Sequence, residues 1–209
     1  MMRTLPALRL FAVVLFTALL SACAGIPPQP VSHPQQVWRA HVVRMQAITR
    51  FMVSAEGGVR AGTHGGTLLL HWRVHPHAYQ MTGYGPFGRL IFRLRVNATG
   101  ARLRTARGRF RGRDAAVLLR RLTGWHLPVA GLRYWILGIP APGPVTAQGL
   151  DRRGLLARLR QEGWVVRYRR YRATHLGRVP RLLTLTYPGH APGAPSVIVT
   201  IRIDRWGFA

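Results

Sequence analysis

Side chains that could support acid–base or metal chemistry are few and scattered along this 209-residue chain. The five carboxylates are far apart in the sequence, at Glu56, Asp114, Asp151, Glu162 and Asp204. Catalytic acid–base pairs and hard-metal sites need several such groups together. His71, His75 and His77 form an H-x₃-H-x-H pattern, but no cysteine or glutamate nearby completes a zinc site. We therefore expect that the protein is not an enzyme and has no metal centre. We interpret Asp114 as a helix N-cap.

Residues 83–88 match G-x-G-x-x-G, the pattern of a dinucleotide-binding loop. That loop requires a helix directly after the glycines, because the helix N-terminus holds the pyrophosphate. Here the following residues, 89–96, alternate as a strand does. The pattern therefore predicts a hairpin turn. Phe87 lies at the tip of this turn, so Gly85, Pro86, Phe87 and Gly88 are candidates for contact with a membrane interface.

Cys23 is the only cysteine, and it lies at the end of an N-terminal export signal. Two arginines precede an apolar run over 10–20, which is too short to span a bilayer permanently. Two small residues then precede the cysteine, and this tetrad resembles the lipobox of bacterial lipoproteins. The resemblance implies diacylglycerol and an N-acyl chain on Cys23, with no other cofactor. Ala24, rather than aspartate, after the cysteine points to the outer membrane.

Positive charge dominates the composition, with 31 Lys+Arg against 5 Asp+Glu and a formal net charge of +26 at pH 7. Every one of these cations is arginine, which is typical of a high-GC codon bias. At 48% hydrophobic residues the chain is too apolar for a disordered basic tail. Two runs, 102–113 and 167–172, interleave arginine with aromatic residues, as single-strand nucleic-acid binders do. Export argues against nucleic acid as a partner. These runs are therefore interpreted as solvated strand faces, with attraction to anionic lipid as the alternative.

The chain divides into a signal peptide at 1–22, the acylated cysteine and a flexible tether at 23–36, and one folded domain at 37–209. Apolar spacing predicts helices over 37–47, 114–122 and 129–137, the last closed by Gly138. Period-two alternation predicts strands over 48–55, 67–74, 78–84, 89–97, 101–106, 164–171, 181–187 and 197–206. Residues 139–149 are expected to be a Pro/Gly loop. Many short strands separated by turns predict an antiparallel sandwich or barrel.

Several predicted strands place their apolar side chains on one face. In 89–96, leucine, phenylalanine and valine alternate with arginine, with Ile91 as the exception. We call the apolar side of each such strand its dry face. The dry faces include Leu68, Leu70, Trp72, Leu90, Phe92, Leu94, Val96, Leu183, Leu185, Val199 and Ile201. One apolar face per strand predicts a sheet with one side turned to a core and the other to solvent.

Taken together, these features resemble the LolB family of outer-membrane lipoproteins, over the whole mature domain. The resemblance is carried by the lipobox at Cys23, Trp38-Arg39, the Gly85-Pro86-Phe87-Gly88 turn, Leu122-Thr123-Gly124, the segment Leu132–Pro140 and the final Asp204-Arg205-Trp206. The Leu132–Pro140 segment is the most specific of these. The family typically has leucine where this chain has Phe87, and the high arginine content departs from better-known members.

The resemblance implies a mainly β (α+β) fold, an open, strongly curved antiparallel half-barrel with an apolar cavity and a helical lid. It implies a monomer, lipid-anchored in the outer membrane, that receives lipoproteins from the periplasmic carrier LolA and inserts them among the phospholipids. The dry faces would then line an acyl-chain cavity, with Leu132, Trp135 and Ile136 on the lid and Phe87 in the inserting turn. The alternative is a lipid-anchored module that binds another lipid or an envelope glycolipid.

Overall fold

The computed structural model describes residues 31–123, 127–188 and 196–208. These residues belong to one compact unit that begins at Val31. The predicted signal peptide and Cys23 lie outside the described residues, as does Gly124. Among the residues described, no helix is both long and apolar enough to cross a membrane.

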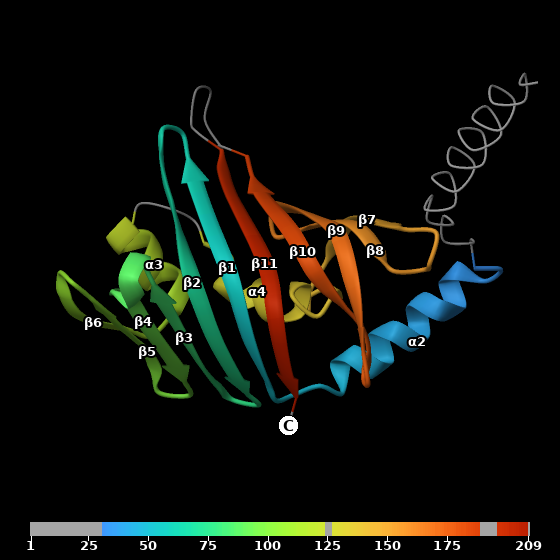
Figure 1. Cartoon of the computed structure of the whole chain (residues 1–209), viewed down its shortest axis with the longest axis horizontal. Helices are drawn as coiled ribbons and strands as arrows, with labels where there is room; N and C mark the ends of the chain where they lie inside the picture. Colours follow the sequence, from blue (N-terminus) through green and yellow to red (C-terminus); the bar gives the residue numbers. More distant parts are fainter. Residues whose placement is uncertain (1–30, 124–126, 189–195, 209) are drawn as a thin grey trace, which may run out of the picture. The chain divides into compact units, whose positions relative to one another are not determined.

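Within the described ranges, eleven strands form one antiparallel sheet (Figure 1). They are β1 (Phe51–Ala61), β2 (His64–His75), β3 (Ala78–Tyr84), β4 (Leu90–Asn97), β5 (Gly100–Thr105), β6 (Gly108–Gly112), β7 (Val145–Leu150), β8 (Leu156–Gln161), β9 (Trp164–Thr174), β10 (Gly177–Tyr187) and β11 (Val197–Phe208). The spatial order is β6-β5-β4-β3-β2-β1-β11-β10-β9-β8-β7. Two meanders, β1–β6 and β7–β11, therefore meet where β1 pairs with β11. The edges β6 and β7 are not paired with each other, so the sheet stays open.

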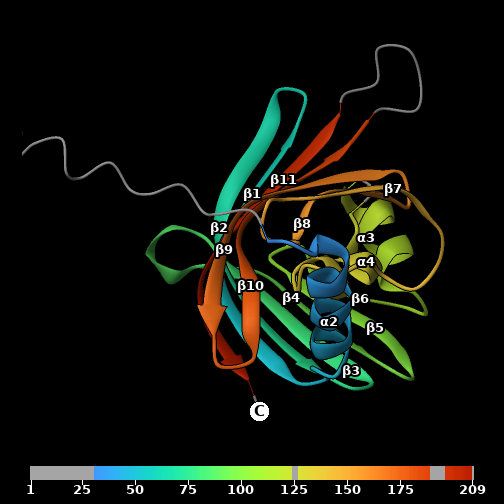
Figure 2. The ribbon, with the colours of Figure 1, turned by 90° about the vertical axis from the view of Figure 1, so that its right-hand side faces the viewer.

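Helices cover one side of this sheet. They are α2 (Pro34–Gln46), α3 (Ala115–Thr123) and α4 (Val129–Trp135). Figure 2 shows the sheet curving around α3 and α4, with the green turn between β3 and β4 on the opposite side. We call the side that faces the helices the inner face and the other side the outer face. The predicted open, curved antiparallel sheet with helices over one side is confirmed.

The ends of the helices follow from local chemistry. The Asp114 carboxylate accepts a hydrogen bond from the Val117 N–H at 2.8 Å, which confirms its predicted role as the cap of α3. After α4, Gly138 adopts a left-handed backbone with φ +77°, and the Ile139 N–H bonds back to the Tyr134 carbonyl at 3.2 Å. Glycine adopts this conformation without the steric cost of a Cβ, so Gly138 closes the segment as predicted, although α4 itself ends at Trp135 rather than at 137.

Several predicted boundaries were wrong. The first strand, expected over 48–55, is β1 at 51–61, and β10 begins at Gly177 rather than at 181. The first helix begins at Pro34 rather than Val37. Proline suits the first turn because its φ is fixed and it needs no backbone partner. The expected Pro/Gly loop at 139–149 contains the edge strand β7 from Val145 onward. Nearly all of β7 is exposed, so apolar and polar residues need not alternate along it and the sequence does not mark it as a strand. The strands β6 and β8 were also missed.

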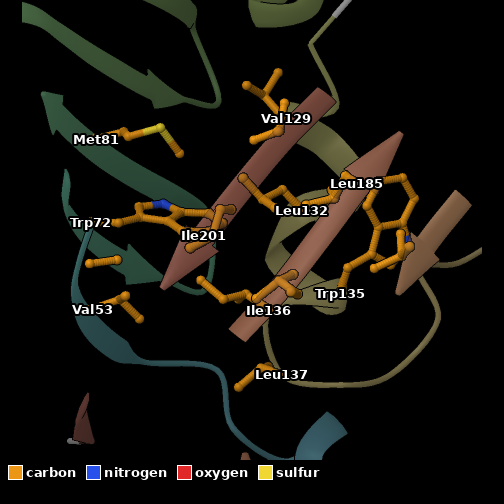
Figure 3. Packing of buried hydrophobic residues seen from close by; sticks show 14 of the residues in the cluster. Val53, Trp72, Met81, Val129, Leu132, Trp135, Ile136, Leu137, Leu185 and Ile201 are labelled. Atoms are coloured by element: carbon orange, nitrogen blue, oxygen red, sulfur yellow. The ribbon is translucent and has the colours of Figure 1, made fainter. Parts of the chain in front are cut away.

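The core lies between the inner face and the helices. Figure 3 shows Leu132 and Ile136 of the α4 segment among Trp72, Leu185 and Ile201 of the sheet. All five are buried and belong to one hydrophobic cluster. Burial of one such side chain contributes about 1.5–3 kcal/mol, so this packing is the main force that holds α4 on the sheet.

Candidate functional site

The residues predicted to line an apolar cavity lie on the inner face and on the α4 segment, with the exception of Leu90. Those buried in the hydrophobic cluster are Leu70, Trp72, Leu94, Leu132, Trp135, Ile136, Leu183, Leu185, Val199 and Ile201. Those only partly buried are Leu68, Phe92 and Val96. Leu90 does not belong to the cluster, because a register shift in β4 pairs it with Tyr84 on the outer face, so its predicted place on the inner face is wrong. Sequence alternation therefore located the inner face. In the structure the protein's own helices cover this face, and its contact with acyl chains stays a prediction.

The partly buried Phe92 explains the first glycine of the G-x-G-x-x-G match. Phe92 pairs with Gly83 across β3 and β4, and its ring lies against the glycine. A Cβ at Gly83 would come within 2.4 Å of the Phe92 ring, so any larger residue would displace the ring. Gly83 therefore seats an aromatic side chain on the sheet, and the rejection of a dinucleotide site is consistent with this geometry.

A buried glutamine ties the end of α4 to the C-terminal meander. The Trp135 indole N–H donates to Gln161 Oε1 at 2.9 Å, and the Ala141 N–H donates to the same oxygen at 2.9 Å. Gln161 Nε2 in turn donates to the Ala141 carbonyl at 2.7 Å. Trp135 and Gln161 are fully buried, so water does not compete for these bonds. We call Trp135, Ala141 and Gln161 the glutamine clamp. Gln161 is not recognisable from the sequence, because a single glutamine before a turn forms no motif.

An arginine ties the same helix to the N-terminal meander. The Arg133 guanidinium donates to the Pro76 carbonyl at 3.1 Å and to the Thr49 carbonyl at 3.5 Å. Pro76 lies in the turn between β2 and β3, and Thr49 lies just before β1. With Gln161 on β8, α4 is hydrogen-bonded to both meanders. Displacing this helix therefore requires breaking polar contacts on both sides.

Gly131 makes room on α4 for the Trp135 indole. A Cβ at position 131 would lie 2.6 Å from the indole ring. Glycine inside a helix costs about 1 kcal/mol relative to alanine, and this close packing is the reason it is tolerated here. The helix, the indole and the glutamine clamp thus form one fitted unit.

The buried donors of the sheet that have no hydrogen-bond partner among the described residues include the Trp72 indole N–H and the Tyr168 hydroxyl. Both side chains belong to the hydrophobic cluster. Burial raises the pKa of Tyr168 well above its usual value, so its hydroxyl stays protonated at neutral pH. Unsatisfied buried donors are rare in folded proteins because each costs about 1–3 kcal/mol. The apolar interior therefore contains two groups able to bind an acceptor.

The turn after β3 presents Phe87 to solvent. Its side chain is 108% exposed relative to a reference residue, and its backbone is left-handed with φ 58°. The Gly85 N–H donates to the Arg89 carbonyl at 2.8 Å and closes the turn. Left-handed backbone costs a large residue about 1–2 kcal/mol, and no burial of Phe87 offsets that cost. An exposed aromatic residue held under strain indicates a functional position.

A groove lies between this turn and the outer face. Its volume is about 660 Å³, and its lining includes Glu56, Leu69, Pro86, Phe87 and Arg202. Arg202 forms an ion pair with Glu56 there. The groove places Phe87 over the outer face, away from the helices.

The histidines noted in the sequence do not converge. His71 stacks edge-on against Tyr84, with ring centroids 5.6 Å apart. In the described part of the chain, no three His, Cys, Asp or Glu side chains gather where they could hold a metal ion. On α2, His41 is buried, and burial lowers its pKa against the opposing effect of hydrogen bonding at the Gly138 backbone.

Comparison with known proteins identifies the family. The family model described as "Outer membrane lipoprotein LolB" matches residues 49–206. The chain belongs to the LolB family. The protein named outer-membrane lipoprotein LolB from Alkalilimnicola ehrlichii is 36% identical over 203 residues, which cover 96% of this chain and 98% of that protein. The LolB of Nitrosococcus oceani is 33% identical over 201 residues, covering 95% and 96%.

A LolB from Pseudomonas aeruginosa is 34% identical over 168 residues, covering 78% of this chain and 82% of that protein. Among solved structures, a LolA superfamily protein from Nitrosomonas europaea superposes with a TM-score of 0.50 at 9% identity, covering 82% of this chain and 93% of that one. That likeness supports the fold alone. The predictions of a LolB-family chain and of an outer-membrane lipoprotein are confirmed.

Proposed function

We propose that this chain receives lipoproteins from the periplasmic carrier LolA, holds their acyl chains against the inner face, and releases them into the outer membrane beside Phe87. The observation that carries the proposal is the combination of an apolar inner face under two short helices with a strained, fully exposed aromatic turn on the opposite side. The transfer makes and breaks no covalent bond, so it needs no catalytic group.

The free energy of hydrating an acyl chain explains why such a carrier is needed. A palmitoyl-length chain has about 15 methylenes, each worth about 0.8 kcal/mol on transfer out of water, or roughly 12 kcal/mol per chain. A lipoprotein carries several chains. Its chains must therefore stay covered from the carrier to the bilayer, and the inner face supplies apolar cover of the same kind.

Entry of an acyl chain requires α4 to move. This movement breaks the Trp135–Gln161 bond on one meander and the Arg133 bonds on the other. The acyl chain then replaces the contacts of Leu132 and Ile136 with the sheet. An ester carbonyl of the lipid would accept from the Trp72 N–H or the Tyr168 O–H, which have no other partner among the described residues.

Release is assigned to the turn. Aromatic side chains favour the membrane–water interface. Phe87 retains the apolar bulk of the leucine typical of the family. Insertion of Phe87 would bring the outer face close to the headgroups while the acyl chains leave the inner face.

The decisive experiment is a transfer assay from the acyl-loaded carrier to the full chain, with brominated acyl chains on the lipoprotein. Bromine quenches tryptophan fluorescence at short range. We expect quenching on transfer. Trp72→Phe and Trp135→Phe should each reduce it and the double variant should remove most of it, while Trp38→Phe leaves it unchanged. Normal transfer without quenching by Trp72 or Trp135 would refute the acyl-chain role of the inner face.

A second arm separates receipt from release. Phe87→Glu should accept lipoprotein normally and fail to pass it to liposomes, whereas Phe87→Leu should do both. Equal release by the glutamate and leucine variants would show that the turn plays no part in insertion.

A further inference from the structure

Six arginines form an array on the outer face of β4, β5 and β6. Leu94 and Leu103, between the arginines of β4 and β5, are buried, and Phe110, between those of β6, is partly buried against the same cluster, so the arginines point outward. The cross-strand pairs are Arg93 with Arg104, Arg95 with Arg102, Arg102 with Arg111, and Arg104 with Arg109. Like charges placed directly opposite each other destabilise a sheet. The array therefore costs stability in the free protein.

Carboxylates do not relieve this repulsion. In the part of the chain that the structure describes, no ion pair joins any of the six arginines to an acid. Glu56 and Asp204 both pair with Arg202, while the Asp114 and Asp151 oxygens accept backbone N–H groups. Gln80 accepts a hydrogen bond from Arg95 at 2.7 Å and carries no charge. The positive charge of the array is therefore available to a partner from outside the described chain.

The array also has a hollow with an unsatisfied donor in it. A depression of about 300 Å³ is lined by the six arginines with Leu103 and Phe110. Arg93 is half-buried, and its Nε–H is buried without a partner among the described residues. Guanidinium groups bind phosphate through paired, charge-assisted hydrogen bonds. The hollow thus offers several converging donors of the kind that a phosphate accepts.

The position of the array favours lipid phosphate. Phe87 and the arginines lie on the same outer face, and Arg93 follows Phe87 by six residues, or about 20 Å of extended chain. An aromatic side chain inserted at a membrane interface would bring these arginines to the level of the headgroups. A soluble acidic protein or free phosphate would have no need of the neighbouring aromatic turn.

We propose that the hollow on β4–β6, lined by Arg93, Arg95, Arg102, Arg104, Arg109 and Arg111, binds the phosphate headgroups of anionic membrane lipids. Occupied headgroup sites neutralise the array and hold the outer face on the bilayer while Phe87 inserts. The inference extends the proposed function. Headgroup binding is measured without any lipoprotein, so a failure of this inference is distinguishable from a failure of the proposed lipoprotein transfer.

The test uses the full chain, labelled with ¹⁵N, in phosphate-free maltoside micelles doped with increasing phosphatidylglycerol. The arginine Nε–H resonances report binding, and we expect a saturable shift that includes Arg93. The double variant Arg93→Gln/Arg104→Gln should weaken binding at least tenfold. The control Arg158→Gln/Arg167→Gln removes a cross-strand arginine pair elsewhere on the same face and should change binding less than twofold.

Arg109→Gln supplies a milder variant if the double variant does not fold, and it should weaken binding severalfold. Equal loss in the array and control variants would overturn the proposal, because net charge would then explain the binding. Inorganic phosphate binding as tightly as the doped micelles would assign the hollow to free phosphate instead. Poly-glutamate binding more tightly than the lipid, with the same dependence on Arg93 and Arg104, would assign it to an acidic protein.

Discussion

The glutamine clamp on the inner side of this sheet and the arginine array on its outer side treat their polar groups in opposite ways. On the inner side, Gln161 is fully buried and bonded to Trp135 and Ala141. On the outer side, the arginine array lacks carboxylate partners in the described chain, and Phe87 is exposed on a strained backbone. The clamp therefore adds stability on the inner side, whereas the array and the strained turn on the outer side cost stability. Such features persist where function requires them. Substitutions should accordingly lower stability on the inner side and leave or raise it on the outer side.

The largest loss is expected from Trp135→Ala. This change leaves a cavity and deprives Gln161 of its donor, so the free energy of unfolding should fall by about 4 kcal/mol. Urea denaturation measures it. Arg109→Gln on the outer face is the control and should stay within about 0.5 kcal/mol of the parent. Comparable losses for the two variants would erase the distinction between the faces.

Removal of the clamp alone should cost less. Gln161→Leu keeps the volume but leaves the Trp135 N–H and both Ala141 backbone groups without their buried partner. We expect a loss of about 2–3 kcal/mol in the same denaturation assay. Gln148→Leu, an exposed position on β7, should be nearly neutral. If both glutamine variants are neutral, the clamp does not hold α4.

A small gain is expected at the turn. Phe87→Gly relieves the left-handed backbone and should raise the free energy of unfolding by about 0.5 kcal/mol, while release into liposomes is lost. Gly88→Ala, next to it with φ +74°, should lower stability by about 1 kcal/mol. Thermal unfolding of the two variants measures these opposite changes in stability. A loss of stability in Phe87→Gly would mean that Phe87 packs against the protein.

The smallest effect concerns pH. Burial holds the pKa of His41 below its usual 6.5, and the nearby Arg44 acts in the same direction. As pH falls below about 6.5, the unfolded chain therefore takes up a proton that the native His41 does not, and stability falls. Above that pH the group contributes no pH dependence. The free energy of unfolding of the parent and of His41→Gln, each measured by denaturation at several pH values, isolates this contribution. The same pH dependence in both proteins would contradict it.

Much of the fold was predictable because single-face alternation and helix ends are local signals. The alternation in β4 located Phe92 and Leu94 on the inner side, and Gly138 marked the end of the α4 segment. The edge strand β7 was not predictable, because an exposed strand needs no apolar alternation. Hydrophobic patterning finds elements that bury a face and misses those that do not.

The site was predictable only in its apolar part. Phe87 is recognisable at the tip of a Gly/Pro turn, but its left-handed backbone is not. Gln161 becomes meaningful only when the fold places it beside Trp135. The arginines of 102–113 were expected to be a solvated face. Which of these arginines lie opposite each other on β4, β5 and β6 depends on the strand register, and the sequence does not specify that register.

The pairing of β1 with β11 has a consequence for biogenesis. Proteins that leave a ribosome or a translocon appear N-terminus first. The β1–β6 meander can therefore form while residues 197–208 are still inside the export machinery, with one whole edge of β1 unpaired until they emerge. An unpaired long strand is a template for aggregation. Because β11 follows the ten other described strands in the chain, it completes the centre of the sheet after they have emerged, and we expect deletion of β11 to separate the two meanders.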